Sequence, residues 1–382
     1  MVTGFRIQSL LKPHRLLLGL LLVGLLLSGC TTGSGAIPKG WSGVTMDNGT
    51  LFLGSMDGRI VAVNTVNNSL EWSVLLQTPP SGGGLFGCTP ATTTVPIYGT
   101  PAIDGDLVYI SGYNGKIYAI SASTRLSKDR YLRKDNNSVP QPIIGSPVVA
   151  GGKVYANSSD GLVYAMDTVS LDERWQFATG DKIWSTPAVE GDTLYVTSFD
   201  KKIYALDANS GSKKWEYKTD GAIVSPAVIN GGTVYFGSLD RYFYALNAAD
   251  GSLKWKFMGE KWFWAKPVVR DGTVYAANLD GKIYALNAED GQKQVEFDLG
   301  SPASASPVLV DELLIVATES GKVYSLDTVS KQQKLFFELG EKVYASLAAS
   351  PPAAGKVYIH SDKDHLYEVD VKSGAKREFN IK

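Results

Sequence analysis

An all-β fold, and within it an eight-bladed β-propeller, is predicted by three features of the 382-residue sequence. Nearly the same segment recurs about every forty residues, as in KIYALDANSGSKKW at 202–215 and YFYALNAADGSLKW at 242–255. Each unit holds four short runs in which apolar and polar residues alternate, and turn dipeptides separate the runs. A period of this length indicates a repeat architecture.

The number of units follows from one recurring position. The counterparts of Tyr204 are Val61, Tyr118, Tyr164, Tyr244, Tyr284, Tyr324 and Tyr367, which gives eight units. In the fourth unit the predicted strands are STPAVEG, TLYVTS, KIYALDA and KKWEYKT. A single four-stranded blade cannot bury both of its faces, whereas blades stacked around an axis cover one another. We therefore predict a ring of eight four-stranded antiparallel blades.

Turn residues support this division into strands. The breaks between first and second strands include Asn48-Gly49 and Asp271-Gly272, and those between second and third strands include Asp57-Gly58. Such dipeptides tolerate positive φ and suit two-residue hairpins. We expect the ring to close without a swapped strand, because residues 41–47 can supply the first strand of the first blade and residues 377–381 the last strand of the eighth.

The N-terminal segment is predicted to lie outside the propeller. Residues 1–15 carry three basic side chains, and the apolar run that follows is short for a membrane span. The run ends in LSGC at Cys30, which resembles the bacterial lipobox. The resemblance implies a signal peptide at 1–29, a lipidated Cys30 in a flexible tether at 30–40, and a propeller at 41–382. It implies an exported, membrane-anchored lipoprotein, located either on the outer membrane facing the periplasm or on the outer face of the cytoplasmic membrane in a single-membrane bacterium.

Composition excludes several classes of function. A formal net charge of -1 provides no basic surface for nucleic acid. Two cysteines and three histidines leave little material for a zinc site, a disulfide scaffold or histidine catalysis. His360 and His365 flank a turn and, with Asp362, suggest either metal binding or simply surface polar positions. We predict no metal site.

The end of each repeat resembles the tryptophan-docking motif of the quinoprotein alcohol dehydrogenase-like propellers, also called PQQ-like repeats. The motif residues are matched in successive units by Ala205, Asp207, Gly211 and Trp215 and by Ala245, Asn247, Gly251 and Trp255. In that family the indole packs between adjacent blades and donates its N–H to a backbone carbonyl. The resemblance therefore implies a structural docking role for Trp72, Trp175, Trp215 and Trp255.

The same resemblance leaves more than one function open. Quinoprotein dehydrogenases bind PQQ between a tryptophan and a disulfide of adjacent cysteines, and this sequence has no adjacent cysteine pair. The lipobox, the tether and the eight units also resemble lipoproteins of outer-membrane protein assembly. We predict a non-catalytic, monomeric scaffold that is anchored to the membrane by lipid, has an envelope protein partner and uses no cofactor. The alternatives are a propeller that binds PQQ, a sugar or a peptide, and a degenerate quinoprotein oxidoreductase.

Candidate binding residues lie where the units depart from the repeat. The first strand of a propeller blade is innermost, and its start lies at the mouth of the central channel. Aligned on their prolines, the units place Tyr98, Ile144, Trp184, Ile223, Trp264 and Ser304 there, with Trp41 in the first unit. Exposed tryptophan is enriched in binding surfaces. We predict a binding rim made of Trp41, Tyr98, Trp184, Trp262, Trp264 and Lys266. The alternative is that these side chains only fill gaps between the blade tops.

Two insertions interrupt the forty-residue rhythm. Residues 76–100 hold Leu85 and Phe86 in a Gly- and Pro-rich setting, which predicts a loop that contacts a partner. Residues 123–142 are basic and are predicted to form a solvated loop. Cys88 has no neighbouring basic residue or helix that would indicate a reactive thiol.

Overall fold

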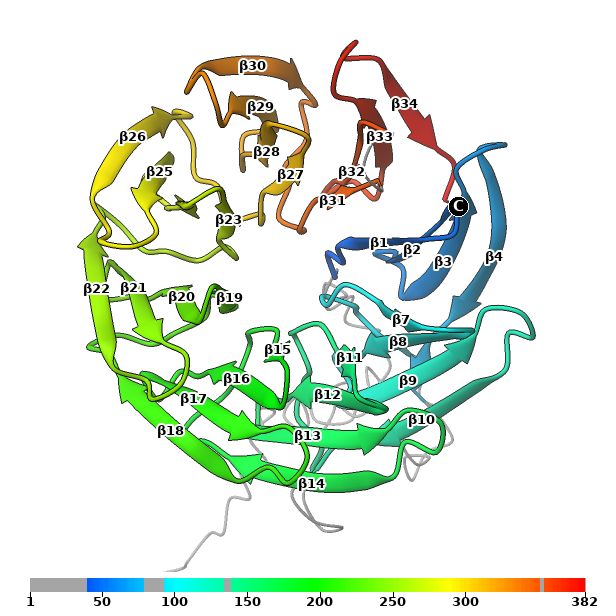
Figure 1. Ribbon diagram of the computed structural model, residues 1–382. Coiled ribbons are helices and arrows are strands. Elements are labelled where there is room, and N and C mark those ends of the chain that lie inside the picture. The colour runs from blue at the N-terminus through cyan, green and yellow to red at the C-terminus, as the bar shows by residue number, and fades with distance from the viewer. Residues whose placement is uncertain (1–39, 79–92, 134–138, 351–353, 382) are drawn as a thin grey trace, which may run out of the picture. The chain divides into compact units, whose positions relative to one another are not determined.

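A computed structural model describes residues 40–78, 93–133, 139–350 and 354–381. Eight four-stranded antiparallel sheets follow one another around an axis, so the predicted eight-bladed, all-β propeller is confirmed (Figure 1). Cys30, Leu85, Phe86 and Cys88 lie outside the described residues, as do the predicted signal peptide and nearly all of the predicted tether. The described ranges contain no helix with the length and apolar character needed to span a membrane.

The first four blades are built from strands that are consecutive in sequence. Blade 1 contains β1 (Val44–Asp47), β2 (Thr50–Gly54), β3 (Arg59–Asn64) and β4 (Ser69–Leu75). Blade 2 contains β7 (Ala102–Asp104), β8 (Leu107–Ser111), β9 (Lys116–Ser121) and β10 (Ser127–Tyr131). Blade 3 contains β11 (Val148–Ala150), β12 (Lys153–Asn157), β13 (Leu162–Asp167) and β14 (Glu173–Ala178). Blade 4 contains β15 (Ala188–Glu190), β16 (Thr193–Thr197), β17 (Lys202–Asp207) and β18 (Lys213–Lys218).

The remaining four blades repeat this order. Blade 5 contains β19 (Val228–Asn230), β20 (Thr233–Gly237), β21 (Tyr242–Asn247) and β22 (Leu253–Met258). Blade 6 contains β23 (Val268–Arg270), β24 (Thr273–Ala277), β25 (Lys282–Asn287) and β26 (Lys293–Asp298). Blade 7 contains β27 (Val308–Val310), β28 (Leu313–Ala317), β29 (Lys322–Asp327) and β30 (Gln333–Glu338). Blade 8 contains β31 (Ala348–Ala349), β32 (Lys356–His360), β33 (Leu366–Asp370) and β34 (Lys376–Phe379).

The hydrophobic core lies between adjacent blades rather than inside any one of them. A typical cluster joins Tyr195, Ile203 and Trp215 of blade 4 to Val234 and Phe236 of blade 5. Each sheet thus buries its apolar residues against the next sheet, so a single blade cannot bury its core by itself. The short first strands lie nearest the axis and the fourth strands form the outer wall (Figure 1).

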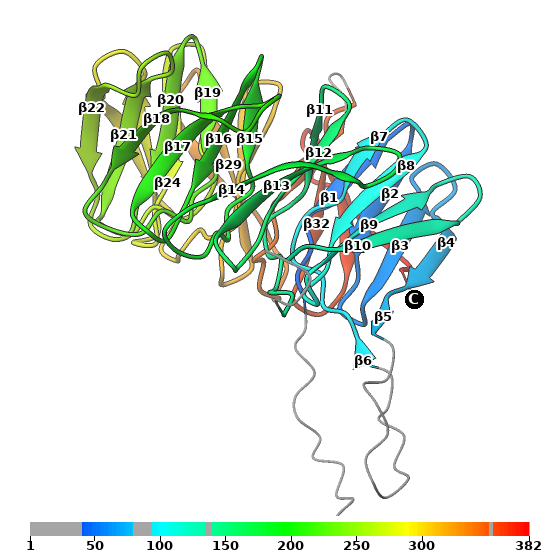
Figure 2. The same ribbon diagram turned by 90° about the horizontal axis from the view of Figure 1, so that it is seen from below.

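Both insertions contain strands. The segment predicted as a basic solvated loop holds β10, which pairs with β9 from Ser127 opposite Ile120 to Tyr131 opposite Lys116. That prediction is wrong for residues 127–131, because they complete blade 2. In the other insertion, β5 (Gln77–Thr78) and β6 (Thr93–Thr94) pair as a two-stranded ribbon that leaves the ring beside blade 1 (Figure 2).

The ring closes between blades 8 and 1, and each of these sheets contains only its own four consecutive strands. Side chains tie the two blades together. His360 is 2% exposed; its Nδ1 lies 2.8 Å from the carbonyl oxygen of Ser42, and its Nε2 lies 3.1 Å from Oδ1 of Asp364. Arg377 donates to the carbonyl oxygen of Thr65 at 2.7 Å. His360 is therefore a buried residue of the closure and not the surface residue suggested by the sequence.

The second histidine of this hairpin faces another partner. His365 Nδ1 lies 2.8 Å from Oε1 of Glu341. The two imidazoles thus have different contact partners and do not face a common site. Over the part of the chain that the structure describes, no cluster of three His, Cys, Asp or Glu side chains is arranged to hold a metal ion.

The docking tryptophans link blades 1, 3, 4 and 5 each to the blade that follows. Trp215 Nε1 donates to the carbonyl oxygen of Ala248 at 3.0 Å, and Trp255 Nε1 donates to that of Ala288 at 3.0 Å. Trp175 donates to Ala208 at a longer distance of 3.3 Å. Trp72 instead lies under the guanidinium of Arg125, 5.2 Å from the ring centroid. All four indoles are at most 9% exposed, which places them in the packing between blades.

Candidate functional site

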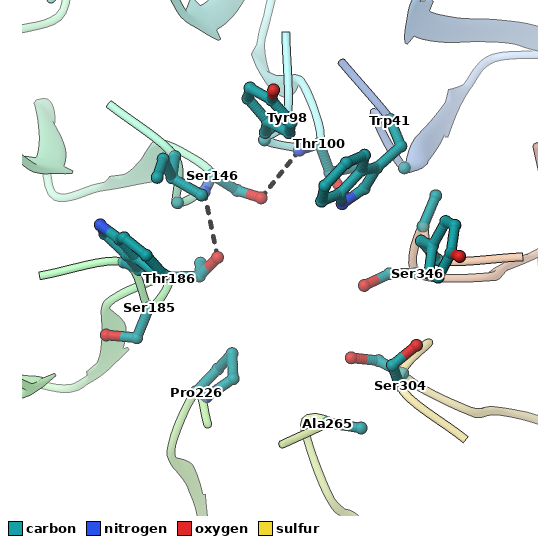
Figure 3. A pocket seen from close by; sticks show the side chains of 18 of the residues that line it. Trp41, Tyr98, Thr100, Ser146, Ser185, Thr186, Pro226, Ala265, Ser304 and Ser346 are labelled. Atoms are coloured by element: carbon teal, nitrogen blue, oxygen red, sulfur yellow. Dashed lines mark hydrogen bonds between the residues drawn. The ribbon is translucent and has the colours of Figure 1, made fainter. Parts of the chain in front are cut away.

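A cavity of about 750 Å³ opens on the axis at the side where the first strands begin. All eight blades contribute to its lining (Figure 3). The backbone before each first strand is extended, so alternate side chains face the axis and the others face the core. In blade 4, Trp184 and Thr186 are partly exposed, whereas Ile183 and Ser185 between and beside them are buried.

Two sets of axis-facing positions result, separated by two residues along each blade. The set nearer the opening, called here the mouth ring, consists of Trp41, Tyr98, Ile144, Trp184, Val224, Trp264, Ser304 and Tyr344. The next set, called the deep ring, consists of Gly43, Thr100, Ser146, Thr186, Pro226, Lys266, Ser306 and Ser346. All of these residues line the cavity except Lys266, which takes the deep-ring position of blade 6.

Aromatic contacts organise one side of the mouth ring. The Trp41 ring meets Tyr98 edge-on, with centroids 4.7 Å apart, and meets Tyr344 at 5.6 Å. Tyr98 in turn contacts Tyr113 at 5.4 Å. Burial is the main cause that raises the pKa of Tyr98, so its phenol stays protonated and able to donate. Four rings from blades 8, 1 and 2 thus form a continuous arc around the opening.

The other two indoles of the mouth ring are separate from this arc. Trp184 meets Phe199 edge-on at 4.7 Å, and the Lys182 ammonium lies 4.7 Å from the Trp184 ring centroid. Trp264 is 36% exposed. An exposed indole at the mouth of a cavity offers an apolar face together with one N–H donor.

The structure brings together most, but not all, of the predicted rim. Trp41, Tyr98, Trp184 and Trp264 line the cavity. Trp262 does not line the cavity. It stands two residues before Trp264 in the sequence and is 48% exposed, and its carbonyl oxygen accepts the N–H of Leu279. Lys266 lies in the deep ring rather than at the rim.

Sequence reasoning misplaced one rim position and missed two others. In blade 5 the buried Ile223 packs in the core, and Val224 faces the cavity, because Pro226 stands one residue early in the forty-residue register. Tyr344 was missed because blade 8 has Leu347 where most blades have the aligning proline. Tyr113 comes from a turn between second and third strands; no signal in the sequence marks it.

Aspartates in the turns between second and third strands lie on the same face but serve the fold. Asp240 accepts the hydroxyl of Tyr244 at 2.8 Å and the backbone N–H of Tyr242 at 2.9 Å. Burial, followed by the Asp240 carboxylate, raises the pKa of Tyr244. The same carboxylate–tyrosine pair recurs at Asp160, Asp200 and Asp280. Asp200 and Asp240 also accept the backbone N–H groups of Gly180 and Asp220, which follow the last strand of the preceding blade. These carboxylates are therefore engaged in holding the propeller together.

One family model and two solved structures are similar to this chain. The family model described as outer membrane protein assembly factor BamB matches residues 99–219 and 172–378. The crystal structure of BamB from Moraxella catarrhalis is similar, with a TM-score of 0.71 and 18% identity over 86% of this chain and 95% of that chain. The computationally designed Ika8 protein has a TM-score of 0.69 and 13% identity, over 90% and 96% of the respective chains. These two likenesses support the fold alone. Curated protein sequences give no match.

Proposed function

This chain belongs to the family of the outer membrane protein assembly factor BamB, and we propose that it is a non-catalytic scaffold that binds a protein partner in the assembly of outer-membrane proteins. Membership in this family supports a location in the cell envelope. The observation that carries the binding role is the set of exposed indoles around one mouth of the ring.

The exposed indoles favour protein contact on physical grounds. Trp41 is 43% exposed, Trp262 48% and Trp264 36%. Large aromatic side chains that remain exposed lose apolar burial, and they are typical of the residues that dominate protein interfaces. Trp262 lies outside the cavity, so the aromatic surface extends beyond the opening and onto the face of blade 6. A partner that covers this face contacts rings from several blades at once.

The proposal has further parts that rest on the sequence. The lipobox at Cys30 supports a lipid anchor, and the family supports a location on the outer membrane facing the periplasm. In an organism with a single membrane, the anchor would place the ring on the outer face of the cytoplasmic membrane. We propose a monomeric ring that uses no cofactor. The quinoprotein alternative is disfavoured because this sequence lacks the adjacent cysteine pair that holds PQQ in the quinoprotein dehydrogenases.

Photo-crosslinking in the native host tests the binding role. We expect a photoreactive residue at position 264 or 262 to capture a component of the outer-membrane assembly machinery. The matched control is position 334, where an exposed lysine stands on the outer strand β30. We expect no such adduct at position 334. If positions 262 and 264 capture no assembly component, or if position 334 captures the same one equally, the mouth face is not the docking surface.

A further inference from the structure

The junction at which blade 8 meets blade 1 has an arginine in the place of a docking tryptophan (Figure 1). Arg377 stands opposite Glu368 in the sheet, which is the cross-strand position that Trp215 holds in blade 4. Its Nη2 donates to the carbonyl oxygen of Thr65 at 2.7 Å, as Trp215 donates to that of Ala248. Charged groups thus do here what an indole does between other blades.

His360 provides a second contact that recurs between blades. Asn157 and Thr197, each the last residue of a second strand, donate to carbonyl oxygens of the following blade at 3.0 and 2.9 Å. His360 is the last residue of β32 and reaches the carbonyl oxygen of Ser42 in blade 1 at 2.8 Å. A carbonyl oxygen only accepts hydrogen bonds, so Nδ1 of His360 carries a hydrogen.

The other nitrogen of this imidazole also faces an acceptor. Nε2 lies 3.1 Å from Oδ1 of Asp364, and this oxygen accepts the backbone N–H of Met56 in blade 1 at 3.0 Å. A neutral imidazole has one N–H, whereas an imidazolium has two. Both contacts of His360 are therefore hydrogen bonds only when the pair holds one further proton. That proton belongs to the imidazole, because an imidazole is ordinarily a stronger base than a carboxylate.

The backbone of Asp364 supports a role for its side chain. Asp364 has a φ of 63° in the turn between β32 and β33. Gly58 and Gly321 hold the same turn position in blades 1 and 7, each with a φ of 83°. A left-handed conformation disfavours a residue with a Cβ, and such residues gather at functional positions. The contacts of the carboxylate with His360 and Met56 offset that cost.

Four segments lie next to the pair: the turn itself, the turn after β2, the loop before β31, and β34. Their titratable and charged side chains are, in that order, Asp362, Lys363 and His365, then Asp57 and Arg59, then Glu341 and Lys342, and Glu378. Asp57 and Arg59 pair with each other at 3.0 Å. His365 faces Glu341 at 2.8 Å and titrates in the same pH range as His360, so a test must separate the two histidines.

We propose that His360 and Asp364 form a proton-dependent contact between blades 8 and 1, called here the closure latch. While the imidazole is charged, it joins Ser42 to Asp364 and, through that carboxylate, to Met56. When the proton leaves, a nitrogen lone pair faces the carboxylate oxygen, and the contact becomes repulsive. A contact that needs the charged imidazole stabilises the fold fully at low pH and is lost as the pH rises. This inference goes beyond the scaffold function and does not rest on it.

Thermal denaturation of the full-length protein in detergent, from about pH 5 to about pH 9, tests the closure latch. The variant is His360→Asn, because Asn157 makes the neutral form of this contact between blades 3 and 4. At about pH 5.5 we expect the unmodified protein to have the higher melting temperature. The difference between the two proteins should shrink as the pH rises through about 6.5 and above, where a histidine ordinarily loses its charge.

Two backgrounds serve as controls. With His365→Asn the difference should shrink as before. With Asp364→Asn, which keeps an oxygen for Met56 but removes the charge, it should no longer shrink. The inference is overturned if the difference stays constant or grows with pH, if its decrease disappears with His365→Asn, or if it survives Asp364→Asn.

A direct measurement covers the case in which His360→Asn fails to fold. Nitrogen NMR of the unmodified protein, labelled at histidine, counts the N–H groups on the imidazole. At about pH 6, two N–H groups on His360 support the closure latch, and a single one overturns it.

Discussion

A Gly251→Ala variant is expected to lose about 3 kcal/mol or more of unfolding free energy, for two reasons that add. Gly251 has a φ of 74°, a left-handed conformation that costs an L-residue about 1–2 kcal/mol. A Cβ at this position would also stand 2.6 Å from Cε3 of Trp215 in the preceding blade. The indole would have to move, which weakens its packing and its hydrogen bond to Ala248.

Urea denaturation measures this loss, and Gly232→Ala is its matched control. Gly232 has a similar φ of 70°, but a Cβ there would meet nothing within 4 Å. The control should therefore lose only the backbone cost of about 1–2 kcal/mol. Equal losses in the two variants would show that the close approach of Gly251 to the indole has no energetic weight.

Removal of the indole itself is the second large effect. Trp215→Ala is expected to lose about 3–5 kcal/mol, as is usual when a large buried aromatic residue is truncated. Trp215 is 8% exposed, lies 5.8 Å from the Tyr195 ring and donates to Ala248 across the blade boundary. Trp215→Phe, which keeps a ring but removes the N–H donor, should lose less. Denaturation midpoints of the two variants give this comparison.

The two changes should not be additive. Once Trp215 is alanine, a Cβ at position 251 has no indole to displace, so Gly251→Ala should then cost only its backbone strain. Residues in direct contact show such coupling in a double-mutant cycle. An additive cycle would contradict the contact between the glycine and the tryptophan.

The glycine of the docking motif shows what the sequence alone does not explain. The motif places a glycine four residues before the tryptophan, but the physical reason lies between blades. Gly211 packs against Trp175, Gly251 against Trp215, and Gly291 against Trp255. Where blade 6 has Val295 instead of tryptophan, blade 7 has Lys331 at the glycine position, with a φ of 59°. In blades 4, 5 and 6 the glycine thus makes room for a tryptophan thirty-six residues earlier. In blade 2, Arg125 takes this position with a φ of 66°, and its guanidinium lies over Trp72 instead.

The fold could be predicted because the repeat is local. Alternating strands, turn dipeptides and a constant period each occur within one unit, and eight units repeat the same pattern. The outer strand β10 could not be predicted in this way. Its residues, SKDRY, show no apolar alternation, and the strand exists because it pairs with β9, where Lys116 and Asp129 form a 2.8 Å ion pair. The burial of His360 likewise depends on Ser42, which is distant in sequence.

The candidate site could be predicted only in part, because alignment of the units finds only those positions that follow the period. Positions that follow the period, such as Trp184 and Trp264, were found by alignment of the units. Positions where the period shifts, as at Val224, or where the aligning proline is absent, as at Tyr344, were not. The hydrogen bonds of the deep ring run between blades, so no single unit of sequence contains them.

The tryptophans of the two rings of contacts differ in role: docking residues hold the blades together, and mouth residues are exposed for binding. Urea denaturation of Trp264→Ala beside Trp215→Ala tests this division most directly. This division predicts that Trp264→Ala loses clearly less unfolding free energy than Trp215→Ala, because Trp264 is 36% exposed whereas Trp215 is 8% exposed and is fixed between two blades. A comparable loss in Trp264→Ala would contradict it, because Trp264 would then be filling a gap between blade tops instead of forming a binding surface.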